Sequence, residues 1–329
     1  MTSRRLAGLA FFLSFALPSH AVDLDRPDVA AFITAMVRDH DYSRDALRDI
    51  MGQARIQRSI IDKISAPAEK RLTWAEYRRI FVTKERIRAG VAFWNENREA
   101  LESASTSTGV PIEILVGIVG VETYFGRIKG GHRVLDALTT LAFDYPPRSK
   151  FFRNELEQFL LLIREENLQA TDAIGSYAGA MGHPQFMPSS FRAYAIDSTG
   201  DGKRDIWNNW HDVAGSVANY FVRHGWRPDG EVVAQATLGQ DWQGPVPKNR
   251  LSPGDTVGGL SRKGVMFATE LSADSAGQLL TLEGHDGKEH WVGFHNFFVI
   301  TRYNRSVMYA LAVHQLGQEI ALEVAADAS

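Results

Sequence analysis

Residues 112–121 read Ile-Glu-Ile-Leu-Val-Gly-Ile-Val-Gly-Val, and Glu122 follows them. If this stretch is helical, apolar side chains lie on almost every side of it, and a helix of that kind is buried in a protein core. Pro111, a residue favoured at the first position of a helix, stands directly before the stretch. The pattern predicts a central buried helix that carries a carboxyl group at its end.

Helical patterns also precede this stretch. Apolar residues recur on one helical face between residues 29 and 37, and Ser43 can cap a second helix. Thr73 and Glu76 match a capping box, which predicts a long helix from there to about Leu101. The chain before the central helix is therefore expected to be helical.

One loop and three further helices are expected around the central stretch. The small polar residues 103–109 are typical of a loop. Helical periodicity covers residues 151–166 and 213–224, and Gly225 can end the second of these helices. Helical character returns after Ser306.

The pattern changes between residues 231 and 297. Short apolar runs, such as residues 265–268 and 279–282, are separated there by Gly, Asp and Pro. Asp286 and Gly287 form a strong signal for a hairpin turn. We expect a small antiparallel β-insertion, so that the fold class is mainly α (α+β).

Composition restricts the kind of protein. The chain has 329 residues, of which 44% are hydrophobic, and a formal net charge of −3, so it is typical of a globular protein without a basic surface for nucleic acid. It contains no cysteine. Disulfides, thiolate zinc sites, cysteine nucleophiles and a lipid anchor on an N-terminal cysteine are therefore excluded.

The first residues indicate export. Arg4 and Arg5 precede an apolar run over residues 6–17, and small residues at positions 19 and 21 frame a cleavage site. The run is too short to cross a bilayer. We expect residues 1–21 to be a signal peptide and the remaining chain to be a soluble periplasmic protein.

Glu122 is the candidate catalytic group. Apolar surroundings disfavour an ionised carboxyl group and raise its pKa, so the acid can give a proton to a glycosidic oxygen and then take one back. The alternative is an ordinary glutamate near a helix end, with its carboxylate in solvent. Periodicity alone does not decide between the two.

Three long segments resemble the lytic transglycosylase B family. Residues 120–126 (GVETYFG) resemble the catalytic Glu-Thr segment, residues 175–190 (GSYAGAMGHPQFMPSS) the substrate-groove motif, and residues 300–306 (ITRYNRS) the Thr-Arg-Tyr-Asn segment. Residues 312–317 (AVHQLG) match the helix that follows. Because these motifs occur in the family's order, the chain is identified as a soluble, non-lipoprotein member, with a core similar to goose-type lysozyme.

The resemblance implies a reaction. Such enzymes cleave the β-1,4 bond between N-acetylmuramic acid and N-acetylglucosamine in peptidoglycan. One glutamate, here Glu122, protonates the leaving oxygen and then deprotonates the C6 hydroxyl of the muramic ring, which closes into a 1,6-anhydro end. A tethered nucleophile has a large proximity advantage and needs no second carboxylate to hold a water. No catalytic cofactor is implied.

The resemblance also implies substrate contacts. Ser176 and Gln185 would bind acetamido or hydroxyl groups, while Tyr303 and Asn304 would orient the acid or the sugar. The aromatic residues Tyr124, Tyr177 and Phe186 would face sugar rings. The alternatives are core packing for the aromatic residues, a loop hydroxyl for Ser176, and a strand-to-helix turn for Tyr303 and Asn304.

One segment departs from the family pattern. The family commonly carries two arginines after Tyr-Pro, but this chain has Pro147 before Arg148. Only Arg148 is carried over as a contact for the peptide stem or the muramyl carboxyl. His183 and Pro184 also fill two variable positions unusually, and Pro184 would stiffen the loop before Gln185.

Residues 197–208 resemble an EF-hand loop. Oxygen-bearing side chains occupy positions 1, 3, 5 and 9, and Gly202 occupies the sharp turn at position 6. Asn208 stands where a bidentate Glu is expected, and the family closes its variant loop with a later aspartate. The alternatives are a plain turn and an N-cap role for that aspartate. The expected structural Ca²⁺ ligands are Asp197, Thr199, Asp201, Lys203, Asp205 and Asp212.

The resemblance divides the chain into units. These are the signal peptide (1–21), an N-terminal helical region (22–109), a lysozyme-like catalytic core with the EF-hand-like loop (110–230), a small β-domain (231–297) and a C-terminal return to the core (298–329). The expected partner is the glycan strand of peptidoglycan. We expect a monomer with no nucleic acid partner and no membrane anchor, and other cell-wall enzymes remain open as partners.

Two other functions remain open at this point. A hydrolytic muramidase would use water and leave reducing ends. A non-catalytic peptidoglycan-binding protein would keep the fold without the reaction.

Overall fold

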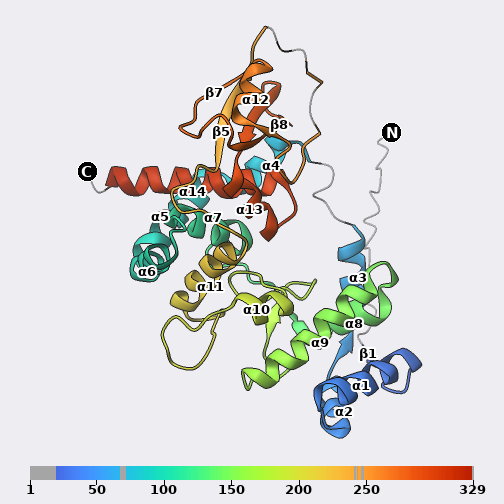
Figure 1. Ribbon diagram of the computed structural model, residues 1–329. Helices are drawn as coiled ribbons and strands as arrows, with labels where there is room; N and C mark the ends of the chain where they lie inside the picture. Colours follow the sequence, from blue (N-terminus) through green and yellow to red (C-terminus); the bar gives the residue numbers. More distant parts are fainter. Residues whose placement is uncertain (1–19, 67–71, 241, 243, 246–247, 328–329) are drawn as a thin grey trace, which may run out of the picture.

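The structure is a computed structural model that describes residues 20–66, 72–240, 242, 244–245 and 248–327. Within these residues the chain is mainly helical, with one five-stranded antiparallel sheet and two pairs of short strands (Figure 1). The predicted mainly α (α+β) class is confirmed. Of the predicted signal peptide, residues 1–19 lie outside the described residues. No helix in the described ranges is long and apolar enough to cross a membrane.

The predicted central helix is α7 (Ile112–Thr123), and it is buried. It begins one residue later than expected, because Pro111 has an extended backbone and is the N-cap. Helix α14 (Val307–Asp327) packs along α7. Glycines allow this close contact: a Cβ on Gly117 would lie 2.4 Å from the Val313 carbonyl oxygen, so any larger residue would push the two helices apart.

The predicted long helix from Thr73 to Leu101 is wrong. The Thr73 capping box is present, but α4 (Trp74–Phe81) ends after two turns because Val82 leaves the helical region, with φ −103° and ψ 77°. Thr83 then caps α5 (Lys84–Glu96) by accepting a hydrogen bond from the Arg86 N–H. Two successive N-caps thus break one apolar periodicity into separate helices.

The predicted loop at residues 103–109 is also wrong. Residues 103–108 belong to α6 (Arg98–Thr108). Gly109, where φ is +70°, is the C-cap of this helix. The hydroxyl groups of Ser107 and Thr108 donate to the Ala104 carbonyl inside the helix. Small polar residues therefore satisfy their hydroxyls locally and do not interrupt this helix.

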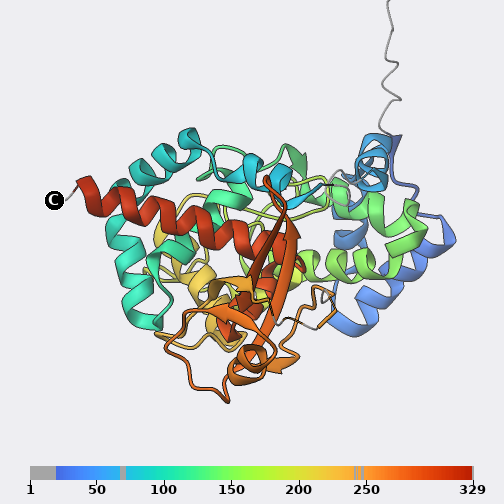
Figure 2. The same ribbon diagram turned by 90° about the horizontal axis from the view of Figure 1, so that it is seen from above.

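A second group of helices lies at the opposite end of the molecule from the C-terminal end of α14 (Figures 1 and 2). In it α8 packs against α9, α3 packs against α8, and α10 packs against α9. The Ser43 cap is confirmed, and so is the helix predicted at 151–166. The elements of this group are α1 (Pro27–His40), α2 (Arg44–Gly52), α3 (Arg58–Ser65), α8 (Val134–Asp144), the 3-10 turn η2 (Pro146–Arg148), α9 (Ser149–Glu165) and α10 (Pro188–Tyr194).

Two pairs of short strands and helix α11 complete the helical part of the molecule. Strand β1 (His20–Ala21) pairs with β2 (Arg55–Ile56), and β3 (His132–Arg133) pairs with β4 (Ile174–Gly175). Helix α11 (Trp210–Arg223) packs against α6, α7 and α10, and Gly225 lies just beyond its C-terminal end. The chain segments before residue 109 therefore divide between the two groups: α1–α3 lie beside α8 and α9, whereas α4–α6 lie beside α7, α11 and α14.

The predicted β-insertion is confirmed. Its strand order is β6-β8-β9-β5-β7, all pairs are antiparallel, and the sheet with α12 holds a separate small apolar core. The predicted turn joins β8 to β9, where Glu283 pairs with Lys288 and Gly287 has φ +119°. The elements are β5 (Val233–Leu238), β6 (Asp255–Thr256), α12 (Val257–Arg262), β7 (Val265–Phe267), β8 (Ala276–Glu283), β9 (Lys288–Gly293) and then α13 (His295–Tyr303).

Candidate active site

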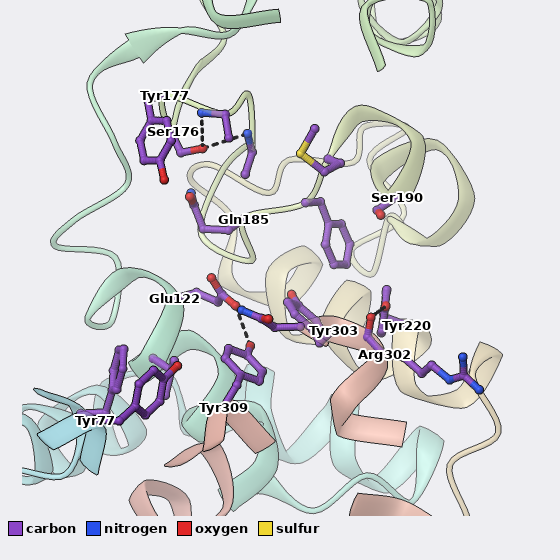
Figure 3. A pocket seen from close by; sticks show the side chains of 17 residues that line it. Tyr77, Glu122, Ser176, Tyr177, Gln185, Ser190, Tyr220, Arg302, Tyr303 and Tyr309 are labelled. Atoms are coloured by element: carbon purple, nitrogen blue, oxygen red, sulfur yellow. Dashed lines mark hydrogen bonds between the residues drawn. The ribbon is translucent and has the colours of Figure 1, made fainter. Parts of the chain in front are cut away.

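A cleft of about 600 Å³ lies where α4, α7, α11, α13, α14 and the segment 176–190 meet. Figure 3 shows Glu122 between Gln185 and Tyr309, with Tyr303 beside it. Among the described residues that line the cleft, Glu122 is the only carboxylic acid. The predicted residues Ser176, Tyr177, Gln185, Phe186, Tyr303 and Asn304 all line the same cleft.

Glu122 is held by a tyrosine from another helix. The Tyr309 hydroxyl of α14 donates a hydrogen bond of 2.6 Å to Glu122 Oε1 (Figure 3). Burial and the nearby Glu122 raise the pKa of Tyr309 and of Tyr303 well above the usual value of tyrosine. Both hydroxyls therefore remain proton donors far into the alkaline range.

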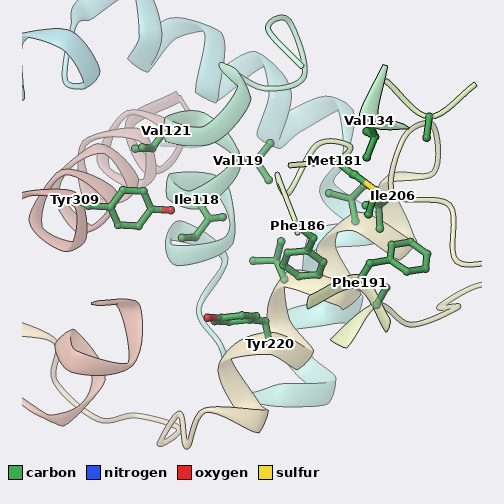
Figure 4. Close-up of a cluster of buried hydrophobic side chains, with 14 of the residues drawn as sticks. Ile118, Val119, Val121, Val134, Met181, Phe186, Phe191, Ile206, Tyr220 and Tyr309 are labelled. Carbon is green, nitrogen blue, oxygen red and sulfur yellow. The ribbon is translucent and has the colours of Figure 1, made fainter. Parts of the chain in front are cut away.

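The end of α7 presents the carboxyl group to the cleft. Tyr124 and Phe125 have left-handed backbone angles, φ 51° and φ 56°, so the helix ends at Thr123, one residue after Glu122. The buried Thr123 hydroxyl accepts a hydrogen bond from the Gly126 N–H at 3.0 Å, which closes this turn. The apolar residues Ile118, Val119 and Val121 on the same helix pack against the core beneath the cleft (Figure 4).

The segment 175–190 forms one wall of the cleft. Ser176 Oγ accepts hydrogen bonds from the Ala178 and Ala180 N–H groups, so it stabilises the loop, as expected if Ser176 is a loop hydroxyl. Ser176 also lines the cleft. Gln185 has φ 53°, and its side-chain amide donates to the Gly182 carbonyl at 2.8 Å. The loop backbone is therefore held in place before any ligand is present.

The aromatic residues differ in exposure. Tyr177 is 37% exposed, whereas Phe186 is buried against Tyr220 and Tyr303, so Phe186 is mainly a packing residue. The Tyr303 hydroxyl donates to the Pro184 carbonyl at 2.7 Å and so ties α13 to the loop. Tyr303 is the last residue of α13 and Asn304 is its C-cap, so they lie at the connection from α13 to α14 and not in a strand-to-helix turn.

Two predicted contacts do not lie in the cleft. The Tyr124 ring is stacked between the guanidinium groups of Arg86 and Arg127, with 4.6 and 5.1 Å from carbon to ring centroid. Arg148 stacks on Phe151 at 4.3 Å. Neither Tyr124 nor Arg148 is among the residues that line the cleft.

Sequence reasoning did not select several residues of the cleft. Tyr309 follows the ITRYNRS motif by only three residues, and that proximity was the one available signal for it. Tyr220 belongs to a helical pattern that indicates only packing. The cleft residues missed in this way are Tyr77, Phe81, Ser190, Tyr220, Arg302 and Tyr309.

The EF-hand-like loop is closed by its own amide groups. Asp197 accepts hydrogen bonds from the Gly200 and Gly202 N–H groups at 2.7 Å each. Asp212 is buried and accepts from the N–H groups of Ser198 and Asp205, at 2.8 and 2.9 Å. The N-cap of α11 is Asn209, so the alternative N-cap role for Asp212 is wrong.

The loop has the charge and donor types of a cation site, but its side chains are not gathered around one point. Burial, together with the charges of Asp197 and Asp201, raises the pKa of Asp212. A bound cation would relieve this repulsion, and oxygen donors are those that Ca²⁺ prefers. Among the described residues, however, no three His, Cys, Asp or Glu side chains converge as metal ligands.

Known proteins resemble this chain over most of its length. The "Transglycosylase SLT domain" family matches residues 25–318. Membrane-bound lytic murein transglycosylase B of Escherichia coli (strain K12) is 40% identical over 307 residues, which cover 91% of this chain and 84% of that protein.

Two solved structures agree with this result. Soluble lytic transglycosylase SltB1 from Pseudomonas aeruginosa is 48% identical, with a TM-score of 0.86 over 90% of this chain and 99% of that chain. Escherichia coli lytic transglycosylase Slt35 in complex with calcium is 40% identical, with a TM-score of 0.84 over 93% of this chain and 97% of that chain.

The fold and the family match are those of a lytic transglycosylase, an enzyme that cleaves peptidoglycan. The chain belongs to the SLT-domain transglycosylase family, and its relatives are of the lytic transglycosylase B type.

Proposed function

We propose that Glu122 is the only acid/base of a lytic transglycosylase reaction on the MurNAc–GlcNAc bond of peptidoglycan. The observation that carries the proposal is the composition of the cleft: Glu122 is the only carboxylic acid among its described lining residues. A protonated Glu122 gives its proton to the leaving glycosidic oxygen. The resulting carboxylate then takes a proton from the attacking hydroxyl.

The lack of a second acid in the described cleft favours ring closure over hydrolysis. Ordinary glycosidases use two carboxylates at a defined separation, one of which activates water or attacks the sugar. The C6 hydroxyl of the muramic ring is already tethered next to the anomeric carbon, so it needs only a base. The products are a 1,6-anhydromuramic end and a free GlcNAc end.

The neighbouring residues have supporting roles in this proposal. Tyr309 holds the carboxyl group through its hydrogen bond to Oε1. Gln185 and Asn304 offer amide groups to acetamido groups and hydroxyls, and Ser176 offers its hydroxyl. Tyr177 offers an exposed ring to a sugar face.

Replacement of one carboxyl group tests this mechanism. Glu122→Gln keeps the size of the side chain but cannot transfer the proton, so we expect kcat on purified peptidoglycan to fall by about 10³ or more. Glu113→Gln, at the other end of α7, is the matched control and should retain activity. Mass spectrometry of the wild-type products should show anhydro ends. Equal activity of Glu122→Gln and wild type, or products with only reducing ends, would contradict the proposal.

We also propose that the loop 197–212 binds a structural Ca²⁺ ion through side-chain oxygens of Asp197, Thr199, Asp201, Asp205 and Asp212 and through the backbone carbonyl of Lys203. Support comes from the oxygen donors, from the carboxylate repulsion at Asp212, and from the related Slt35 structure in complex with calcium. Residues of the cleft carry the reaction, so calcium acts on stability alone.

Thermal unfolding with calcium and with a chelator tests the ion site. Calcium at 100 times its dissociation constant should stabilise the fold by about 2.7 kcal/mol, and Tm should rise by several degrees. Asp212→Asn should remove this rise. Asp172→Asn, an exposed acid outside the loop, should leave it intact. No change of Tm between calcium and chelator would count against the site.

Finally, we propose that the protein works as a soluble monomer in the periplasm, after removal of residues 1–21. The division into units at residues 109, 230 and 297 belongs to the same proposal. Cell fractionation with an antibody, together with N-terminal sequencing of the mature protein, tests the location and the cleavage site.

A further inference from the structure

A second cavity of about 470 Å³ lies beside the catalytic cleft. Three segments line it: residues 129–130, residues 166–174 and residues 203–208. None of the functions assigned above uses this cavity, although residues 203–208 also belong to the EF-hand-like loop.

Neighbouring parts of the same chain segments line the cavity and the cleft. Ile174 lines the cavity, and Ser176 and Tyr177, two and three residues further along the same segment, line the cleft. The Gln185 side chain, which lines the cleft, donates a hydrogen bond of 3.3 Å to the Lys129 carbonyl. A group attached to a sugar in the cleft can therefore reach the cavity over a short distance.

Two of the three cationic side chains that line the cavity have no carboxylate partner in the described ranges. Lys129 is half-buried and Lys203 is exposed, and neither ammonium group forms an ion pair with a carboxylate in the described ranges. Arg204 and Glu166 form an ion pair and so cancel each other.

The two remaining acids differ from each other. Asp205 is occupied by the N–H groups of Trp207 and Asn208, at 2.9 and 3.0 Å. Asp172 is exposed, and the one hydrogen bond that its carboxylate accepts from the described residues comes from the neighbouring Thr171 hydroxyl at 3.4 Å. Two ammonium groups and one carboxylate therefore remain open to a ligand.

The rest of the cavity wall is apolar. The Trp207 indole N–H donates to the Ile174 carbonyl at 3.3 Å, which fixes the ring as part of the wall. Leu168 and Ile174 are 36% and 38% exposed, so both present apolar surface to the cavity. The surface is thus suited to a ligand that carries methyl groups as well as charges.

We propose that this cavity binds the peptide stem of peptidoglycan while the glycan lies in the cleft. A peptide stem carries several free carboxylates, alanine methyl groups and a side-chain amine, which match Lys129 and Lys203, the apolar wall and Asp172 respectively. A glycan strand offers hydroxyl and acetamido groups and would leave both ammonium groups without a counter-charge. The proposal rests on the function proposed above, because it needs a peptidoglycan substrate.

The first test measures binding without turnover. Stem peptides released from murein by an amidase are titrated calorimetrically into Glu122→Gln protein, in the presence of calcium. We expect binding, and we expect the added pair Lys129→Gln/Lys203→Gln to weaken it by about tenfold. Lys248→Gln/Lys288→Gln removes the same charge from exposed positions outside both cavities and should leave binding unchanged. Absence of binding, or equal affinity with and without Lys129 and Lys203, would overturn the proposal.

The second test compares two substrates. On peptide-bearing strands we expect Lys129→Gln/Lys203→Gln to lower kcat/KM by about tenfold, and on amidase-stripped strands by less than about twofold. An equal loss on both would mean that the cavity binds glycan, which contradicts the proposal. A wild-type enzyme that releases no anhydro ends from either substrate would refute the proposed function instead, since the peptide titration does not depend on turnover.

Discussion

At the scale of single residues, the chemistry of the cleft depends on one carboxyl group and one hydroxyl group from different helices. Glu122 lies in the last turn of α7, and Tyr309 lies in the first turn of α14, 187 positions later in the chain. The hydrogen bond of 2.6 Å between them fixes which way the carboxyl group faces. Since the pKa of Tyr309 is raised well above the usual value of tyrosine, the hydroxyl stays protonated and remains a donor at neutral pH.

Tyr309→Phe should show whether the Tyr309 hydroxyl positions Glu122 or only supports the fold. The substitution keeps the buried ring and removes only the hydroxyl, so we expect kcat to fall by about tenfold with little change in KM, because Glu122 loses its alignment. Steady-state kinetics on soluble glycan strands would measure this. Tyr42→Phe, which removes another buried hydroxyl bonded to the Leu160 carbonyl, is the matched control. If both variants lost kcat equally, Tyr309 would have a purely structural role.

At the scale of elements, α7 and α14 pack closely against each other. A Cβ on Gly317 would lie 2.1 Å from the Glu113 carbonyl oxygen, and one on Gly117 would lie 2.4 Å from the Val313 carbonyl oxygen. One glycine lies on each helix and faces the backbone of the other helix, so the two glycines together set the distance between α7 and α14. The same spacing brings Tyr309 within reach of Glu122.

Gly117→Ala should therefore affect both stability and activity. The added methyl group meets backbone atoms that cannot rotate away, so we expect a loss of about 2 kcal/mol or more in the free energy of unfolding. Activity should fall with it, because α14 moves away from Glu122. Urea denaturation and activity assays would measure both effects. Gly131→Ala is the control, since no atom lies within 4 Å of its added Cβ. A fully active Gly117→Ala protein would show that this spacing is not required.

At the scale of the whole molecule, buried histidines make stability depend on pH. Burial, with a smaller contribution from Lys129, lowers the pKa of His183 to about 4, and burial lowers that of His314 to about 4. Their Nδ1 atoms are buried and have no hydrogen-bond partner among the described residues. Both imidazoles are therefore held neutral inside the fold under conditions in which an exposed histidine takes up a proton.

The sign of the pH effect follows from proton uptake. Between pH 6.5 and 4 the unfolded chain binds protons at these two histidines and the folded chain does not, so stability is full above pH 6.5 and falls as the pH is lowered. The slope is at most about 1.4 kcal/mol per pH unit for each histidine. Paired carboxylates such as Asp28 and Glu165, whose pKa values are lowered by arginines, add their loss only at lower pH.

Urea denaturation from pH 7.5 to 4.5 would measure this slope. The slope should become smaller in His183→Gln and in His314→Gln, because each removes one proton-binding group from the unfolded chain. It should stay the same in His285→Gln, whose side chain is 72% exposed in the folded protein. A slope that none of the three substitutions changes would show that these buried imidazoles are not its source.

Local patterns in the sequence determined much of this protein. The apolar run at residues 112–121 required a buried helix, because no surface position could hold it. The turn at Asp286-Gly287 and the caps at Ser43 and Thr73 depend on neighbouring residues alone, and each occurs as predicted. The motif around Glu122 was also readable, because its residues are close together in the chain.

Tertiary structure alone decided which side chains share the cleft. Tyr220, Arg302 and Tyr309 enter it because α11, α13 and α14 pack around α7, and helical periodicity shows which face is buried but not what that face meets. The same limit explains Tyr124, whose neighbours in sequence predict a groove residue but whose ring is stacked between two arginines. Capping and periodicity depend on residues within a few positions of each other, so they predict individual helices. Contacts between residues far apart in the chain depend on how whole helices pack.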